Sequence, residues 1–435
     1  MIIDRGAGLY VPSNSHAAGA IIGLFRCVGR FRLPIMARAI VFFVGPLLAA
    51  AVTIDTNFEG GSLGRIEKIS ETHYRLGVKG EKDQDGRNRQ ANWYYFEVRE
   101  APAAEMTLDI VDLPGEYNYR PNRGAITADT PPVISYDQKT WQHVDRFEYD
   151  AAEPKLRLRI RPAGSRFWIA HVPPYTNRNL RRLRDEIAGH PNFQEEAIGK
   201  TAGGRELVLW TIRDGDTRGK KTVWLMFRQH SWEAGSSWTG EGAVRALMDQ
   251  NPAGRRLRKR MVWKIFPLCD PDGVARGGVR FNVYGYDLNR NWDITDPAKM
   301  PEITAQRNAV QRWLAAGHSI DLFLSLHNTE TAEYLEGSPG AVGPLRGLGE
   351  RLFRILCDRT TFSPSRPLAV AQTSTTPGKP GRMTVIQGLY RDFKIPGFLM
   401  EQRISQNSKP GHLPEISDRL RFGAELVQAI SAALE

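Results

Sequence analysis

The stretch Thr222-Val-Trp-Leu-Met-Phe-Arg-Gln-His-Ser-Trp-Glu233 carries a short, almost wholly apolar run straight into polar residues. Similar runs recur at residues 261–266, 321–326 and 397–400. Patterns typical of helices lie between and beside them, at residues 177–187, 240–250, 302–316, 344–358 and 415–434. Continuous apolar strands that alternate with helices are typical of a sheet buried on both faces. We therefore expect an α/β fold in which helices flank a mixed, largely parallel sheet.

The chain before this region has a different rhythm. Short segments at residues 74–78, 92–98, 106–110 and 156–160 alternate apolar and polar side chains or are rich in aromatic residues. Turn-forming stretches such as Asp83-Gln-Asp-Gly86 separate them, which is typical of an antiparallel β-sandwich. The rhythm changes at Pro173-Pro-Tyr-Thr176. We therefore predict an N-terminal segment over residues 1–51, a β-sandwich domain over 52–172 and an α/β domain over 173–435.

Composition excludes several classes of protein. Of 435 residues, 41% are hydrophobic and 25% are charged, which excludes collagen-like and disordered chains. No apolar run reaches the ~18–20 residues that a membrane helix needs, so we expect no stable membrane insertion. The formal net charge is +11, of which the first 51 residues contribute +4 through five arginines and one aspartate. The remainder is still basic, which favours acidic partners without identifying one.

The N-terminal segment resembles an export signal. The apolar run over residues 39–52 follows Arg30, Arg32 and Arg38 and contains Ala49-Ala-Ala51, which offers small side chains for cleavage. Because residues 1–35 precede this pattern, we expect translation to start at Met36 and the mature chain to begin near Val52. Export would place the protein in the periplasm or outside the cell. The alternative is a disordered tail before a first core strand, in a cytoplasmic protein.

Polar side chains follow the apolar strands. Ligands of open α/β sheets gather beyond the carboxyl ends of the strands, so these side chains are the candidate functional residues. They include His230, Glu233, Arg280, Asn289, Arg290, His327 and Glu401.

His-x-x-Glu spacing alone does not select a metal site. It occurs three times, at His230/Glu233, His327/Glu330 and His412/Glu415. The first pair follows a buried strand and precedes a helix, whereas the third lies in a turn-like stretch. Two imidazoles and one carboxylate suit Zn²⁺ and leave a fourth tetrahedral position to water. We therefore predict one zinc ion per chain, held by His230, Glu233 and His327.

The other polar residues suit hydrolysis beside a carboxylate. Zinc lowers the pKa of bound water, and Glu401 could remove its proton as general base. Arg280 would polarise the scissile carbonyl and stabilise its oxyanion. Asn289 and Arg290 offer a planar set of donors for a substrate carboxylate. Any one of these residues could merely end a strand or form a salt bridge, but the ordered set favours a catalytic site.

With these residues in place, the sequence resembles the zinc metallocarboxypeptidases of the carboxypeptidase A/B superfamily. Within them it is most similar to the cytosolic-carboxypeptidase-like, or deglutamylase-like, subfamily. The resemblance covers nearly everything after residue 52, and its most specific part is Asp270-Pro-Asp-Gly273, Arg280 and Gly285-Tyr-Asp-Leu-Asn-Arg-Asn-Trp292. It implies the roles given above for each candidate residue, and a β-sandwich before the catalytic domain.

The sequence departs from the family pattern in three places. The family usually has Pro-Gly between the zinc-binding His and Glu, where this chain has Ser231-Trp232. The usual Asn before Pro-Asp-Gly is Asp270. No tyrosine falls where better-known members place the tyrosine that caps the substrate, since Tyr390 lies too close to Glu401 in the sequence.

A basic segment bears on substrate preference. Gly378-Lys-Pro-Gly-Arg382 resembles the glycine–arginine segment that deglutamylase-like members place in the side-chain pocket. The resemblance implies that Arg382, aided by Lys379, favours a C-terminal Glu or Asp. The alternative is a solvated loop charge.

The expected function is hydrolysis of the C-terminal peptide bond of peptides or proteins, and two other functions stay open. A zinc amidase or deacylase acting on N-acyl amino acids or murein peptides would share the metal chemistry, but Asn289 and Arg290 beside Arg280 favour capture of a C-terminal carboxylate. A non-catalytic peptide-binding module is disfavoured because all the ligands and Glu401 are present. The basic residues 255–260 are expected to form a solvated helix end or turn, so we predict no nucleic-acid partner. The oligomeric state is not indicated.

Overall fold

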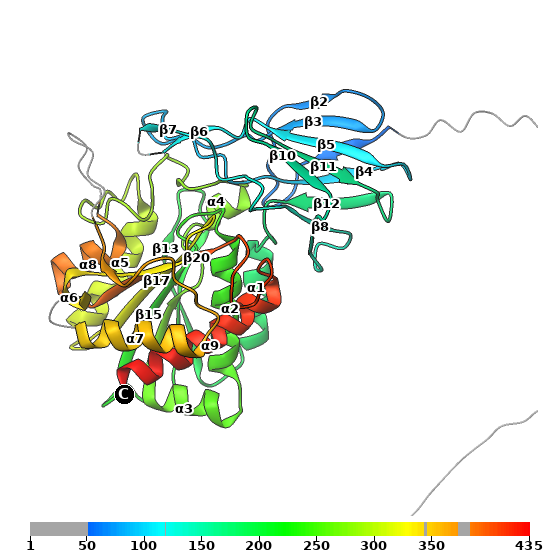
Figure 1. Cartoon of the computed structure of the whole chain (residues 1–435). Helices are drawn as coiled ribbons and strands as arrows, with labels where there is room; N and C mark the ends of the chain where they lie inside the picture. Colours follow the sequence, from blue (N-terminus) through cyan, green and yellow to red (C-terminus); the bar gives the residue numbers. More distant parts are fainter. Residues whose placement is uncertain (1–50, 118, 343–345, 373–382) are drawn as a thin grey trace, which may run out of the picture. The chain divides into compact units, whose positions relative to one another are not determined.

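The computed structural model describes residues 51–117, 119–342, 346–372 and 383–435. Residues 50–435 form one compact unit, which Figure 1 draws as a ribbon coloured along the sequence. The signal-like residues 1–50, and Lys379 and Arg382, lie outside the described residues. None of the described helices is both long and apolar enough to cross a membrane.

The first part of the described chain is a β-sandwich. Its strands are β1 (Thr53–Asp55), β2 (Ile66–Lys68), β3 (His73–Gly77), β4 (Tyr95–Arg99), β5 (Met106–Val111), β8 (Val133–Ser135), β9 (Gln142–His143), β10 (Phe147–Asp150), β11 (Lys155–Ile160) and β12 (Arg166–Ala170), with a separate hairpin of β6 (Gly115–Tyr117) and β7 (Arg120–Asn122). One sheet has the order β1-β4-β12-β8-β9 and is antiparallel. The other has the order β10-β11-β5-β3-β2, in which β3 and β5 pair in parallel. The expected sandwich is confirmed, with one parallel pair that side-chain alternation does not reveal.

Alternation decides which face of each sandwich strand is buried. In β11, Leu156, Leu158 and Ile160 are at most 5% exposed, whereas the basic residues between them are only partly buried. Successive side chains of a strand point to opposite faces of the sheet, so the apolar set enters the core and the basic set faces outward. The core between the two sheets includes these residues with Phe96 and Phe167.

The second part is built on an eight-stranded mixed sheet. Its strands are β13 (Phe193–Lys200), β14 (Glu206–Ile212), β15 (Lys221–Phe227), β16 (Met261–Phe266), β17 (Leu322–Thr329), β18 (Tyr334–Gly337), β19 (Ala369–Val370) and β20 (Gly397–Arg403), in the order β13-β14-β16-β15-β17-β20-β18-β19. The central strands β16, β15, β17 and β20 are parallel to one another. The pairs β13–β14, β14–β16 and β18–β20 are antiparallel, whereas the edge pair β18–β19 is parallel. The mixed sheet with a parallel centre confirms the expected fold class.

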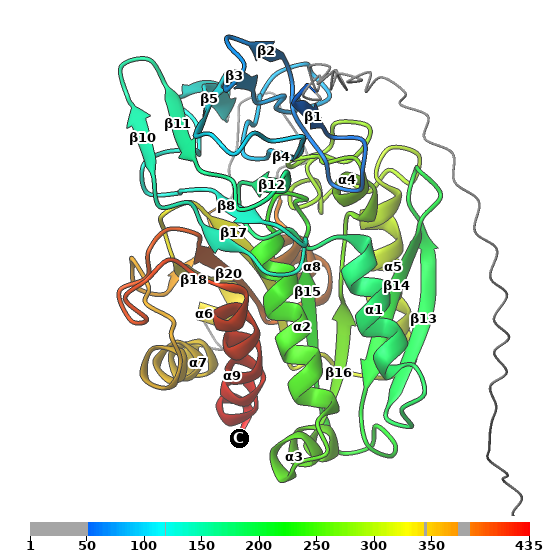
Figure 2. The ribbon, with the colours of Figure 1, turned by 90° about the vertical axis from the view of Figure 1, so that its right-hand side faces the viewer.

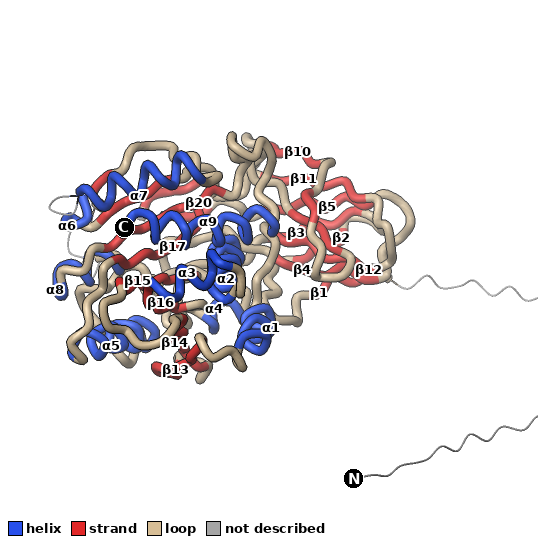
Figure 3. The backbone as a smooth tube through the Cα atoms, turned by 90° about the horizontal axis from the view of Figure 1, so that it is seen from below, coloured by secondary structure: helices blue, strands red, loops and turns tan. Residues whose placement is uncertain are grey.

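Helices cover both faces of this sheet. They are α1 (Asn177–Ile187), α2 (Ala234–Met248), α3 (Pro252–Arg260), α4 (Pro271–Ala275), α5 (Pro301–Ala315), α6 (Pro339–Val342), α7 (Arg346–Arg359), α8 (Val385–Phe393) and α9 (Ile416–Leu434). Val223, Leu225 and Phe227 of β15 pack with α2, α7 and α9, whereas Trp224 and Met226 pack with α5 and α8. Figure 2 views the α2–α9 side, and Figure 3 shows strands running between this group and α5 and α8. A sheet covered on both faces explains why its central strands are continuously apolar.

Some elements differ from expectation. Helix α1 and strand β16 have the expected bounds, but α2 begins at Ala234 instead of 240. Helices α3 and α8 were not expected as separate elements. The basic residues 255–260 lie within α3, and Arg258 is buried, its guanidinium donating to the Asp249 carbonyl (2.8 Å).

Candidate metal and substrate site

Three buried side chains converge at the carboxyl edge of the central strands. His230 and Glu233 lie on the turn between β15 and α2, and His327 lies near the end of β17. Their candidate ligand atoms all lie within 4.8 Å of one another. Nδ1 of His230 is 2.6 Å from one Glu233 oxygen, and Nδ1 of His327 is 3.0 Å from the other. Each side chain is at most 3% exposed.

A chain of hydrogen bonds sets the tautomer of His327. Gln229 Nε2 donates to the Leu288 carbonyl (2.7 Å), so Gln229 Oε1 must accept from the Ser325 hydroxyl (2.9 Å). The Ser325 oxygen then accepts from His327 Nε2 (2.8 Å), which favours a proton on Nε2 over the longer contact that Asn289 Nδ2 makes with the same nitrogen (3.3 Å). Nδ1 of His327 therefore presents a lone pair to the Glu233 carboxylate, an arrangement that a cation between them satisfies.

Asp287 contacts the second ring nitrogen of His230, as Ser325 does for His327. Asp287 Oδ1 lies 3.1 Å from His230 Nε2, and burial would raise the pKa of Asp287, but Arg280 and His230 hold it well below its ordinary value. The carboxylate accepts the Nε2 proton, which leaves Nδ1 facing Glu233. Metal-binding histidines ordinarily donate their second ring nitrogen to such a partner. The donor set of two imidazole nitrogens and one carboxylate therefore fits a zinc ion with one open position.

Glu401 lies on β20, directly opposite His327 on β17. Its Oε2 has no hydrogen-bond partner among the described residues. Burial and the Glu233 carboxylate raise the pKa of Glu401 well above its ordinary value, and Arg280 opposes them. A cation held by the neighbouring triad would lower this pKa again, because it favours the ionised carboxylate.

The predicted carboxylate-binding residues lie beside the triad. Arg280 Nε donates to Asp287 Oδ2 (2.7 Å), so Asp287 contacts both Arg280 and His230. Asn289 is buried, and its Oδ1 accepts from the Val385 backbone N–H (3.0 Å) while its Nδ2 lies 3.3 Å from His327 Nε2. Arg290 Nη1 donates to the Asn289 carbonyl (2.7 Å). The fold thus brings together all the predicted site residues that lie in its described part.

The β-sandwich contributes residues that the sequence did not single out. The ring of Tyr117, at the end of β6, lies 5.7 Å from the Arg280 guanidinium, and its hydroxyl lies 3.5 Å from Arg290 Nη2. A small cavity beside the two arginines is lined by Asn88, Gln90, Tyr117, Arg280, Phe281, Asp287 and Arg290. Asn92 Nδ2 donates to Glu330, near the end of β17 (2.8 Å). Asp287 lay within a stretch the sequence did single out, but Ser325, Tyr117 and Asn92 carry no local signal of their roles.

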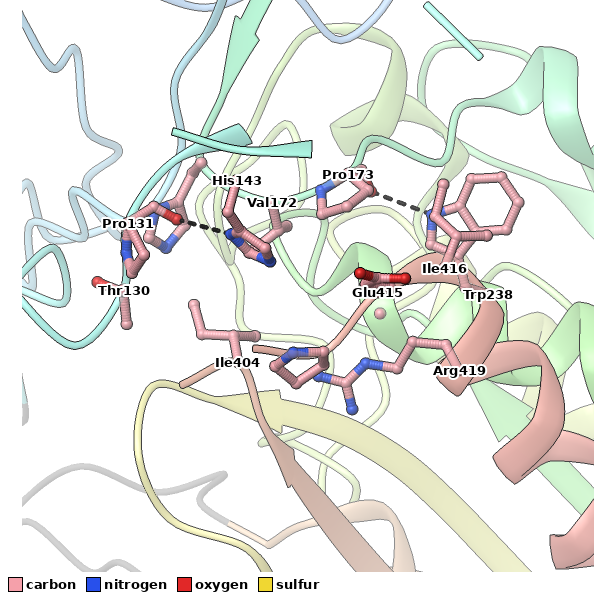
Figure 4. A pocket seen from close by; sticks show the side chains of 13 residues that line it. Thr130, Pro131, His143, Val172, Pro173, Trp238, Ile404, Glu415, Ile416 and Arg419 are labelled. Atoms are coloured by element: carbon pink, nitrogen blue, oxygen red, sulfur yellow. Dashed lines mark hydrogen bonds between the residues drawn. The ribbon is translucent and has the colours of Figure 1, made fainter. Parts of the chain in front are cut away.

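A second cavity, of about 20 Å³, is lined by residues of the sandwich and of the α/β part. Figure 4 shows the hydrogen bonds from His143 Nδ1 to the Pro131 carbonyl (3.4 Å) and from Trp238 Nε1 to the Pro173 carbonyl (3.1 Å), with Arg419 below. This volume is about that of one water molecule. None of the predicted site residues lines it.

The fold and the triad define a zinc hydrolase with a mixed α/β catalytic sheet. Residues 181–336 match the family model described as zinc carboxypeptidase. Residues 54–171 match the model described as cytosolic carboxypeptidase N-terminal domain. Over these two stretches the chain is similar to zinc carboxypeptidases, which supports a zinc metallocarboxypeptidase with a cytosolic-carboxypeptidase-type N-terminal domain.

Particular relatives extend this match along the chain. An uncharacterised protein of Zymomonas mobilis is 25% identical over 84% of this chain and 93% of its own length. Cytosolic carboxypeptidase 6 of Mus musculus is 25% identical over 64% of this chain and 54% of its own length. The chain therefore spans about half of that mouse protein.

Solved structures share the fold. The metallo-carboxypeptidase of Burkholderia cenocepacia has a TM-score of 0.75 at 21% identity, over 88% of this chain and 99% of that chain. The metallo-carboxypeptidase of Pseudomonas aeruginosa has a TM-score of 0.73 at 23% identity, over 88% and 99% of the two chains. At these identities the similarity shows a shared fold. Because it covers 88% of this chain, the shared fold includes the sandwich as well as the α/β part.

Proposed function

We propose that this chain hydrolyses the C-terminal peptide bond of peptides or proteins, with Glu401 as general base. The observation that carries the proposal is Glu401 placed opposite His327, at the edge of a His230–Glu233–His327 triad. A bound zinc ion supplies Lewis-acid polarisation and lowers the pKa of water at the open position. Glu401 accepts a proton from the attacking water and returns it to the leaving amine.

Three further side chains bind and orient the substrate in this proposal. Asn289 and Arg290 bind its terminal carboxylate through planar donors, which selects C-terminal residues over internal ones. Arg280 donates to the scissile carbonyl oxygen as negative charge develops there. Asp287 supports the Arg280 assignment, because it holds that guanidinium and the ligand His230 through its two oxygens.

We also propose a preference for acidic C-terminal residues, through Arg382 with Lys379. The Gly378–Arg382 segment and the basic net charge support it. If Arg382→Ala leaves the ratio of kcat/KM for Glu-ended and Leu-ended peptides unchanged, this preference has another origin.

We further propose the division into a sandwich domain over residues 52–172 and a catalytic domain over 173–435. Export stays a prediction, and N-terminal sequencing of protein from the native host tests cleavage near Val52.

The direct test is release of amino acids from peptides ending in Glu, Asp, Lys, Leu and Phe. Zinc-loaded enzyme is compared with chelated enzyme and with Glu401→Gln, and an N-acyl amino acid and a murein peptide serve as further substrates. Release of one residue at a time, lost in both controls, supports the proposal. Cleavage of the N-acyl substrate or murein peptide alone assigns an amidase. Bound zinc with no turnover of any substrate assigns a binding module.

A further inference from the structure

The segment that carries Arg280 has little regular secondary structure. Residues 279–290 contain Arg280, Asp287, Asn289 and Arg290, and they form neither a helix nor a named strand. A single bridge joins Phe281 and Asp287 across a turn. Hydrogen bonds within the segment hold its turn over residues 282–286, and Asp287 holds the Arg280 guanidinium, but the backbone N–H groups of residues 279–281 donate to another part of the protein.

Glu81 of the sandwich accepts these backbone N–H groups. Its Oε2 accepts three successive backbone N–H groups, from Val279 (3.0 Å), Arg280 (2.6 Å) and Phe281 (2.8 Å). The other oxygen forms an ion pair with Arg276. Successive N–H groups that converge on one point form an anion-binding concavity, and hydrogen bonds to a carboxylate are stronger than those to a neutral acceptor. One carboxylate therefore fixes the backbone on both sides of Arg280.

The stretch that carries Glu81 is itself well ordered. Asp83 Oδ1 accepts from the backbone N–H groups of Asp85 (3.0 Å) and Arg87 (2.8 Å), and Asp83 Oδ2 accepts from Asn88 Nδ2 (2.7 Å). Glu81 and Gln90 form a bridge at its base. Glu81 thus projects from a braced loop, residues 81–90, which we name the sandwich loop.

The sandwich loop makes a second contact with the same segment. The Gln84 backbone N–H donates to the Gly285 carbonyl (3.0 Å). At Gly285, where φ is +83°, a Cβ would lie 2.4 Å from the Gln84 nitrogen. Only glycine fits both this conformation and this approach. The two contacts lie at either end of the turn between Arg280 and Asp287.

We propose that Glu81 is a positioning residue for catalysis, which sets the place of Arg280 through the backbone of residues 279–281. The inference rests on the proposed function and assigns the sandwich a part in the active site. Oxyanion stabilisation depends on donors placed within fractions of an ångström, and a 1 Å misplacement can cost about 10²-fold in rate. Displacement of Arg280 therefore lowers kcat more than it raises KM.

The test compares Glu81→Asp with wild type. Aspartate keeps the charge but withdraws the carboxylate by ~1.5 Å, and we expect kcat to fall about 10- to 100-fold while KM changes less than about threefold. The matched control is Glu59→Asp. The Glu59 side chain also reaches from the sandwich to the α/β part, where it accepts the N–H of Asn177 at the start of α1 (3.1 Å), but it does not contact the 279–290 segment. Its kcat is expected to stay at the wild-type value. Glu81→Gln, which keeps the length and an acceptor oxygen, is expected to fall between wild type and Glu81→Asp.

Two further measurements separate positioning from general stability. Hydrogen exchange of the amides of residues 279–281 should quicken in Glu81→Asp and not in Glu59→Asp. In an Arg280→Ala background, Glu81→Asp should change kcat less than about threefold, because its effect passes through Arg280. A lowered melting temperature with wild-type kcat would overturn the inference, as would an equal loss of kcat in both backgrounds. Inactivity of zinc-loaded wild type would instead refute the proposed function, and exchange at residues 279–281 would still test the contact.

Discussion

His327 and Glu401 are register partners on the adjacent parallel strands β17 and β20. Partners on neighbouring strands project from the same face of a sheet, with backbones about 4.8 Å apart. A slip of one residue between these strands would turn Glu401 to the other face and away from the triad. The spacing of the proposed zinc ligand His327 and the proposed base Glu401 is therefore set by backbone pairing in the middle of the sheet.

Glu401→Gln should abolish most turnover while zinc binding is kept. The amide cannot accept the proton from water, and loss of a general base costs about 10²- to 10⁴-fold in kcat. The measurement is kcat on the best peptide substrate, with zinc content determined by mass spectrometry. Glu196→Gln is a matched control, because Glu196 lies on the edge strand β13 and pairs with Arg312. Activity within tenfold of wild type in Glu401→Gln would place the base elsewhere.

Removal of zinc should abolish activity and lower thermal stability together. A cation bound to the proposed triad would bind only the folded chain, and a ligand at 100 times its Kd stabilises the folded state by about 2.7 kcal/mol. Differential scanning fluorimetry with and without chelator should show a lower Tm, restored by one equivalent of Zn²⁺. His327→Ala should show neither the restoration nor activity. If neither Tm nor kcat changes when chelator is added, the zinc assignment is contradicted.

Much of the fold is predictable because its central strands are continuously apolar. Strand β16 and helix α1 have the bounds that the sequence pattern predicts. Helix α2 is harder, because it is buried nearly all round and starts with Ala234-Gly-Ser-Ser237, so no amphipathic stripe marks its first turns. The parallel pairing of β3 with β5 also carries no signature in alternation, since alternation specifies faces and not partners.

The site divides in the same way. Ligands that follow apolar strands can be predicted, since parallel strands deliver their carboxyl ends to one edge. Glu81, Tyr117 and Ser325 cannot, because their roles depend on partners that only the folded chain brings close. Glu81 reaches the backbone of Arg280, which is 199 positions away in the sequence. No spacing rule contains that pairing, so the part played by the sandwich emerges only from the structure.

The two substrate-binding arginines should separate in their kinetic effects. Arg280→Lys should lower kcat by about 10²- to 10³-fold, because its donors act on charge that develops in the transition state. Arg290→Ala should mainly raise KM, because the terminal carboxylate is bound in the ground state and the transition state alike. Steady-state kinetics on one peptide measure both. Arg184→Ala is the control, since Arg184 lies on α1 and pairs with Glu195 on the edge strand β13, away from the site. Equal effects on kcat and KM in both variants would refute these separate roles.

Asp270→Asn should stabilise the protein, and more so at alkaline pH. Asp270 is fully buried, with one oxygen lacking a partner among the described residues. Burial, with help from Glu302 and Glu81, raises its pKa from 3.8 to about 7, although Arg276 and the Gly273 N–H oppose this. Between these values the folded chain retains a proton that the unfolded chain has lost. The free energy of unfolding therefore falls as pH rises through this window.

Asparagine removes this loss, because it is neutral in both states and its oxygen can still accept the Gly273 N–H that Asp270 accepts at 2.8 Å. Each pKa unit corresponds to about 1.4 kcal/mol, so the wild-type penalty above pH 7 is on the order of 4 kcal/mol and is mostly absent near pH 4. Urea unfolding of both proteins at pH 5 and pH 8 should show a larger advantage of the variant at pH 8. Asp129→Asn, at an exposed position, should track wild type at both values. An advantage that is equal at the two pH values would mean that Asp270 is ionised in the folded protein throughout, stabilised by Arg276 in spite of its burial.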